Sequence, residues 1–258
     1  MLSGDSVFWS RDGEVFRAPK DGGDPELIGT TEGEWTISGQ DLVATGPANE
    51  PAPVIRTPIG GGPSEEILPL DPETYVRTLV PLGDGILVQR SRDLLLIPAS
   101  GAPLFLAEGT ATGGGSPVAA GGFAYFGATD PLDFGKGPRL QRVSISGGEA
   151  AEILLDGFPV AIAVAGDTLY TNVVLRRPDH TFVGTLVHLP ASGGAATAMA
   201  LTDASSEPAS PNSWGAYQHK TGGLQAGAER VYFFELCTEI EWAEYRLVSL
   251  PVDHVLSL

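Results

Sequence analysis

Two short turn motifs recur six times each along the chain, and this double repeat restricts the possible folds more than any other feature. The first motif is a glycine turn that precedes an apolar strand. The second is a turn that begins with proline or serine and usually contains glycine. Glycine supplies the positive φ that a tight hairpin needs, and proline suits a strand end where no ladder donor is required. The copies of the first motif are Ser3-Gly4-Asp5, Ser38-Gly39-Gln40, Leu82-Gly83-Asp84, Ala120-Gly121-Gly122, Ala165-Gly166-Asp167 and Ala226-Gly227-Ala228. The copies of the second begin at Pro19, Pro58, Pro98, Ser144, Pro190 and Pro251, and the last copy has no glycine.

The spacing of the second motif indicates the architecture. From Pro19 it recurs after 39, 40, 46, 46 and 61 residues, and each repeat holds about four short apolar segments. Periods of roughly 40 to 50 residues with four strands per unit are typical of β-propeller blades. We therefore predict an all-β fold, a six-bladed β-propeller with four-stranded antiparallel blades. We expect one domain over residues 1–258, with repeats at about 1–30, 31–71, 72–109, 110–157, 158–203 and 204–258.

The ends of the chain complicate the strand count. In the second repeat we expect strands at residues 34–38, 42–45, 54–57 and 65–70, whereas only five residues precede the second strand of the first repeat. An inner strand needs about five residues and a turn. The first blade is therefore expected to lack its inner strand, and the chain to be part of a longer precursor. An open blade edge favours pairing with another chain, so self-association through the first blade is expected as an option.

The repeat resembles the six-bladed TolB-like and YWTD-type propellers. The resemblance lies in a Gly-Asp turn, an aromatic strand and an Arg-x-Pro-x-x-Gly-Gly segment, here Val7-Phe8-Trp9-Ser10 and Arg17-Ala18-Pro19-Lys20-Asp21-Gly22-Gly23. True YWTD tetrads are absent, and Leu169-Tyr170-Thr171-Asn172 is only related to them. The motif is structural, so the resemblance implies a fold and no particular activity.

Composition narrows the partners. The net charge of −17 disfavours nucleic acid and anionic membranes, and leaves basic proteins, cations and neutral sugars. Cys237 is the only cysteine, which excludes an internal disulfide and a cysteine-rich zinc site. The sequence shows neither a signal peptide nor a transmembrane run. A periplasmic or secreted location is expected if a signal was removed upstream.

Loop lengths suggest where a ligand would bind. From the first motif to the second, the six repeats take 15, 19, 15, 23, 24 and 24 residues, and a long connection at about 203–223 precedes the sixth blade. In propellers the loops between second and third strands open on the same face as the connections between blades, and long loops commonly carry function. The ligand-binding candidates on this face are Asp130, Asp133, Lys136, Arg176, Arg177, His180, Trp214, Tyr217, His219, Glu239, Glu241 and Trp242.

No sequence motif assigns a reaction, a metal or a cofactor. The two loop histidines have no metal-ligand spacing, and no calcium loop, phosphate loop or nucleophile elbow occurs. The leading hypothesis is a non-enzymatic binding or scaffold propeller that recognises a protein, peptide or glycan through the long-loop face. One alternative is a hydrolase or lyase at the channel mouth, with or without a metal. The other is a structural repeat fragment of a larger envelope or filament protein.

Overall fold

The computed structural model describes residues 2–83, 85–110, 115–128, 139–155, 157–176, 182–202, 224–237 and 244–253. The chain divides into two compact units, residues 1–105 and 106–258, and each is described here by itself. The described residues form strands joined by turns and loops and contain no helix, so no helix of theirs could cross a membrane.

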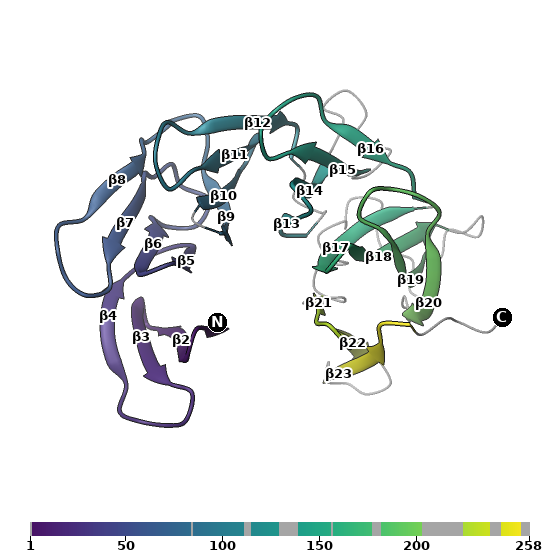
Figure 1. The fold of residues 1–258 in the computed structure, drawn as a ribbon, viewed down its shortest axis with the longest axis horizontal. Coiled ribbons are helices and arrows are strands. Elements are labelled where there is room, and N and C mark those ends of the chain that lie inside the picture. Colours follow the sequence, from purple (N-terminus) through teal and green to yellow (C-terminus); the bar gives the residue numbers. More distant parts are fainter. Residues whose placement is uncertain are drawn as a thin grey trace. The chain divides into compact units, whose positions relative to one another are not determined.

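The first unit contains three antiparallel sheets, each made of consecutive strands in their chain order (Figure 1). The outermost strand of the third sheet, β12, spans the boundary between the units. The first sheet consists of β1 (Leu2–Ser3), β2 (Ser6–Arg11), β3 (Glu14–Pro19) and β4 (Glu26–Thr30). The second consists of β5 (Trp35–Ser38), β6 (Asp41–Thr45), β7 (Val54–Pro58) and β8 (Glu65–Leu68). The third consists of β9 (Val76–Leu82), β10 (Gly85–Arg90), β11 (Asp93–Ile97) and β12 (Leu104–Glu108).

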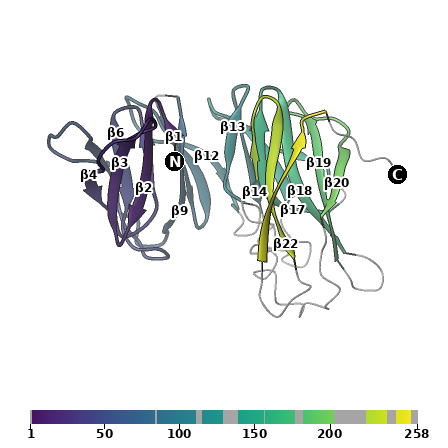
Figure 2. The same ribbon diagram turned by 90° about the horizontal axis from the view of Figure 1, so that it is seen from below.

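The second unit repeats this arrangement in three further sheets, and Figure 2 shows their strands running along a common direction within the unit. The fourth sheet consists of β13 (Val118–Ala120), β14 (Phe123–Ala128), β15 (Arg139–Ser144) and β16 (Ala151–Ile153). The fifth consists of β17 (Phe158–Ala165), β18 (Thr168–Arg176), β19 (Phe182–Pro190) and β20 (Thr197–Thr202). The sixth consists of β21 (Gln225–Ala226), β22 (Arg230–Cys237) and β23 (Glu244–Pro251).

These six antiparallel sheets confirm the predicted fold class, and two details of the strand count need comment. The inner strand of the first sheet is reduced rather than missing: β1 has two residues, which pair with Val7 and Ser6 of β2. Residues 254–258, which follow β23 of the sixth sheet, lie outside the described residues.

In every sheet for which both motifs are described in full, the two motifs meet in space at the same end of the strands. The residue after the leading proline or serine donates its backbone N–H to a carbonyl beside the glycine turn, as Lys20 does to Asp5 at 2.9 Å and Ala191 to Asp167 at 2.8 Å. The sixth sheet keeps this bond, Val252 to Glu229 at 3.0 Å, although its motif has lost glycine. The paired motifs therefore connect the turn between the first and second strands to the end of the third strand. We call this end of the strands the turn edge.

The middle sheet of each unit, which is the second or the fifth sheet, packs on both faces because side chains alternate along its strands. Leu42 packs toward the first sheet, with Phe8 and Val15, whereas its neighbour Val43 packs toward the third, with Ile86. In the second unit, residues 161–163 alternate in the same way between the fourth and sixth sheets. Each fully buried aliphatic side chain of this kind contributes about 1.5–3 kcal/mol to stability.

At the opposite end of the strands lie two kinds of connection. One joins the second and third strands of a sheet, and the other leads to the next sheet. In antiparallel order the second strand ends where the fourth strand ends, so both connections leave from the same edge. We call it the connection edge. In the first unit it comprises residues 12–13, 31–34, 46–53, 69–75 and 91–92.

Candidate binding site

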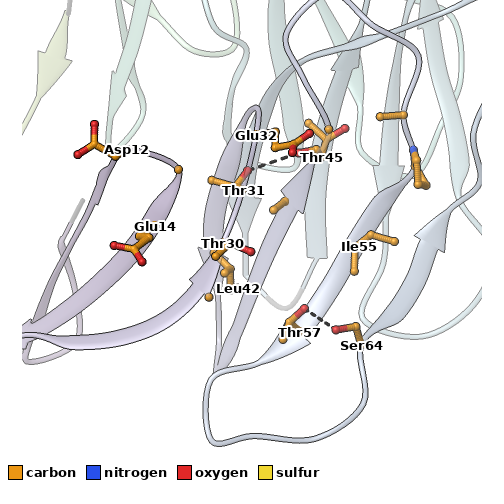
Figure 3. Close-up of a pocket in the computed structure, with 16 residues that line it drawn as sticks. Asp12, Glu14, Thr30, Thr31, Glu32, Leu42, Thr45, Ile55, Thr57 and Ser64 are labelled. Carbon is orange, nitrogen blue, oxygen red and sulfur yellow. Dashed lines mark hydrogen bonds between the residues drawn. The ribbon is translucent and has the colours of Figure 1, made fainter.

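A pocket of about 740 Å³ opens between the first two sheets and reaches the connection edge (Figure 3). This volume lies in the range of ligand-binding clefts. Its upper lining comes from three connections: the β2–β3 turn, the β4–β5 segment and the β6–β7 loop. The lining residues are Asp12, Gly13, Glu14, Gly29, Thr30, Thr31, Glu32, Leu42, Ala44, Thr45, Gly46, Ala52, Pro53, Ile55, Thr57 and Ser64.

The floor of the pocket is one face of the second sheet. Leu42 is paired with Thr57 and Ala44 with Ile55 across β6 and β7, so these four side chains lie on the same face. Near the bottom, the hydroxyls of Thr57 and Ser64 are 2.9 Å apart. The floor is thus apolar in its centre and carries a hydroxyl pair at its lower end.

Small residues in the lining of the pocket let the first two sheets approach each other closely. A Cβ on Gly29 of β4 would lie 2.6 Å from a methyl carbon of Leu42, so β4 approaches the second sheet closely at this point. At the mouth, a Cβ on Gly33 would overlap the carbonyl oxygen of Gly46. The β4–β5 and β6–β7 connections are therefore in direct backbone contact.

Hydrogen bonds fix the mouth further. The hydroxyl of Thr31 accepts the N–H of Gly33 at 3.2 Å and lies 3.4 Å from the carbonyl oxygen of Thr45, to which it donates. The N–H of Thr31 donates to the carbonyl of Gly13 at 2.8 Å. The β2–β3 turn itself is set by Asp12 and Gly13, with φ values of 53° and 81°, which suit an Asp-Gly hairpin turn. Such fixed connections favour a preformed site.

The charge at the mouth is negative. Asp12, Glu14 and Glu32 are all exposed, and among the residues that the structure assigns to the lining there is no lysine, arginine or histidine. Glu14 lies on the opposite face of β3 from buried Val15, which packs toward the second sheet, so the Glu14 carboxylate points away from that sheet (Figure 3). Beside this rim, Nε of Arg11 is 3.4 Å from the Asp12 carboxylate, and both side chains are at least 80% exposed. An ion pair so exposed stabilises little.

A fourth carboxyl group, that of Glu34, lies in the β4–β5 connection beside Glu32. More than a third of the surface of Glu34 is exposed, yet partial desolvation raises the pKa of its carboxyl above the ordinary value. The neutral form is therefore favoured relative to a freely solvated glutamate.

The connection edge of the third sheet carries an ion-pair network. The guanidinium of Arg90 contacts the carboxylates of Asp93 and Asp71. The backbone N–H of Glu73 is the main cause that lowers the pKa of Asp71, helped by the Thr74 hydroxyl and by the charge of Arg90. The hydrogen bond to Asp93 is the main cause that raises the pKa of Arg90. This network joins the β10–β11 turn to the connection that enters β9.

The sites predicted from the long loops fall elsewhere in the chain. Arg176 is the last residue of β18, and of its side chain nothing is described. The other eleven lie outside the described residues: Asp130, Asp133, Lys136, Arg177, His180, Trp214, Tyr217, His219, Glu239, Glu241 and Trp242. Within the described ranges, no group of three or more His, Cys, Asp or Glu residues is placed to hold a metal ion.

Sequence reasoning did not find the pocket between the first two sheets. Loop length directed attention to the later repeats, whereas this pocket results from small residues on short connections. The available signal was the cluster of glycines and threonines from Gly29 to Gly33, opposite Gly46 and Ala52, together with the acidic residues beside it.

The comparisons with known proteins concern structure alone. No protein-family model matches the sequence, and no curated protein is significantly similar to it. The β-propeller domain of the Trilobed protease from Pyrococcus furiosus, described as having an open velcro topology, is similar with a TM-score of 0.61 and 10% identity over 97% of this chain and 82% of that one. The nidogen/laminin complex contains a chain similar at a TM-score of 0.53 and 11% identity, over 96% of this chain and 90% of that one. A TolB-type protein from Agrobacterium tumefaciens is similar at 0.51 and 17% identity, over 77% of each chain.

Likenesses at these identities show the fold and nothing finer. Together with the six antiparallel sheets, they define the class of the protein: a six-bladed β-propeller.

Proposed function

We propose that the chain is a non-enzymatic binding or scaffold propeller that recognises a protein, peptide or glycan through the connection edge. The observation that carries this proposal is the pocket of about 740 Å³ at that edge, whose mouth is built from three fixed connections. Propellers of this fold are found in binding complexes, as in the nidogen/laminin complex, and also in a protease. The finer assignment to the TolB-like or YWTD-like type rests on the turn motifs and remains part of the proposal.

Two hairpins of the later repeats are longer than a hairpin of the first unit. In the fifth sheet, β18 and β19 form nine paired positions, and in the sixth, β22 and β23 form eight, compared with four between β10 and β11. Residues 177–181 and 238–243, which join the strands of these two hairpins, lie outside the described residues. We propose that Trp214 and Trp242, in the long loops of these repeats, supply aromatic contacts to the partner.

The test begins with selection of a binder without assuming its chemistry. The immobilised chain is screened against a random peptide display library and a glycan array, and the tightest binder is measured against Trp214→Ala and Trp242→Ala. Phe105→Ala is the matched control, because Phe105 is an aromatic residue 50% exposed on β12, away from the connections. We expect binding at least about fivefold weaker in one tryptophan variant and unchanged in the control. If both tryptophan variants bind like the wild type, the proposed face is wrong for the later repeats.

A further inference from the structure

We propose that the pocket between the first two sheets accepts a lysine or arginine side chain from a basic segment of a partner protein. This inference rests on the proposed binding function and specifies its ligand class.

The lining matches the two-part chemistry of a long basic side chain. Lysine and arginine bury their methylene stems against apolar surface while the charged head remains near polar groups. Here Leu42, Ala44 and Ile55 provide an apolar surface on the floor. The rim provides the carboxylates of Asp12 and Glu32. The described lining contains no cation, and the ion pair of Asp12 with neighbouring Arg11 is highly exposed.

The electrostatic environment favours a cation over other occupants. A cleft lined by charges of one sign concentrates ions of the opposite sign, and the chain as a whole carries −17. Anionic ligands would be repelled by the rim. A sugar would find no aromatic ring among the sixteen lining residues on which to stack.

The position of the pocket favours a protein as the source of the cation. It opens at the connection edge and not inside a sheet, so an extended segment can lie across the mouth while one side chain enters. The contact of Gly33 with Gly46 and the bond from Thr31 to Gly13 fix the mouth before binding. A preformed site of this kind reduces the conformational entropy that binding costs.

The experiment measures fluorescence anisotropy with a labelled, amidated peptide of alternating alanine and lysine, at low and at physiological salt. The Asp12→Asn, Glu32→Gln double variant removes the rim charges and leaves the backbone unstrained, because asparagine tolerates the positive φ of residue 12. Its matched control is Asp21→Asn, Asp24→Asn, which removes the same charge from exposed residues outside the pocket. Ala44→Met fills the floor without changing any charge.

The expected result is binding that weakens with salt, falls about tenfold in the rim variant and at least as much in Ala44→Met, and is unchanged in the control. Equal losses in rim variant and control would show nonspecific attraction to an acidic surface and overturn the proposal. So would equal binding of a peptide with norleucine in place of lysine, or no binding of the lysine peptide at all. If free 1,5-diaminopentane displaced the lysine peptide at the same concentration, the cation would not need to come from a protein, and that part of the proposal would be overturned.

Two controls keep the result interpretable. Thermal unfolding followed by circular dichroism checks that each variant folds, and if the rim variant does not fold, Ala44→Met and the salt dependence decide the question. The library selection under "Proposed function" assumes nothing about charge. A selected binder that is lost in the tryptophan variants but unaffected by Ala44→Met would leave the binding function standing and overturn this inference alone.

Discussion

Arg90 and Asp93 form a two-pronged ion pair across the β10–β11 turn, with Nε of Arg90 2.7 Å from Oδ1 of Asp93 and Nη2 2.6 Å from Oδ2. Both side chains are largely buried, at 15% and 12% exposure, and the remaining Nη1 of Arg90 donates to Asp71 at 3.0 Å. Bidentate pairs of this geometry are the strong ones among charged hydrogen bonds.

Asp93→Asn should therefore destabilise the protein by about 2 kcal/mol, because Arg90 keeps its buried charge, loses one of its two hydrogen bonds to residue 93 and faces the NH2 donor of asparagine. Urea unfolding followed by tryptophan fluorescence measures the change. The exposed pair of Arg92 and Glu73, at 67% and 73% exposure, provides the comparison, and Glu73→Gln should have little effect. Equal losses in the two variants would show that burial of the pair does not matter.

Gly33→Ala should destabilise the first unit by at least about 2 kcal/mol, because the new methyl group would overlap the Gly46 carbonyl and force two backbone segments apart. Gly60→Ala is the matched control, since nothing lies within 4 Å of a Cβ at that position and its φ is not in the left-handed region. The control should be neutral or slightly stabilising. Thermal unfolding of both variants checks the prediction, and a neutral Gly33→Ala would mean that the two connections are not in contact.

Tyr125→Phe should reduce stability by about 1 kcal/mol. The buried hydroxyl of Tyr125 in the fourth sheet donates to the carbonyl of Ala191 in the fifth at 2.6 Å. Loss of one buried hydrogen bond costs about this much, and the carbonyl keeps a second donor in Nη1 of Arg142 at 3.2 Å. Urea unfolding of Tyr125→Phe, Arg142→Gln and the double variant measures the coupling. Strictly additive losses would show that the two donors act independently.

Glu34 predicts a specific pH dependence. Its pKa is raised in the folded state, so between the ordinary value and the raised one the folded protein binds more protons than the unfolded chain. Stability contributed by this group therefore decreases as pH rises through that window. Glu34→Gln should raise the unfolding temperature at neutral pH, and the gain should disappear below the ordinary pKa of a glutamate. A gain that is equally large in acid would have another cause.

The repeat architecture was accessible from the sequence because turn chemistry is local. Pro19, Gly22 and their counterparts must adopt particular φ angles, and these residues mark strand ends wherever they occur. The two-residue strand β1 was missed because its existence depends on pairing with Val7 and Ser6, which turn motifs do not record. The pocket was missed for a similar reason. Contacts such as Gly29 with Leu42 join strands that follow one another only through a connection, and the space beside them depends on how two sheets pack.

The central claim is that the connection edge binds partners, and the most direct test maps the contact surface by NMR. Uniformly ¹⁵N-labelled protein is titrated with the tightest peptide from the library selection, and the amides whose chemical shifts change are assigned. We expect the changes to concentrate in residues 12–14, 30–34 and 46–53, with further changes along the connections at 177–181 and 238–243. Changes confined to the turn edge, at residues 19–23, 58–62 and 190–194, would contradict the account.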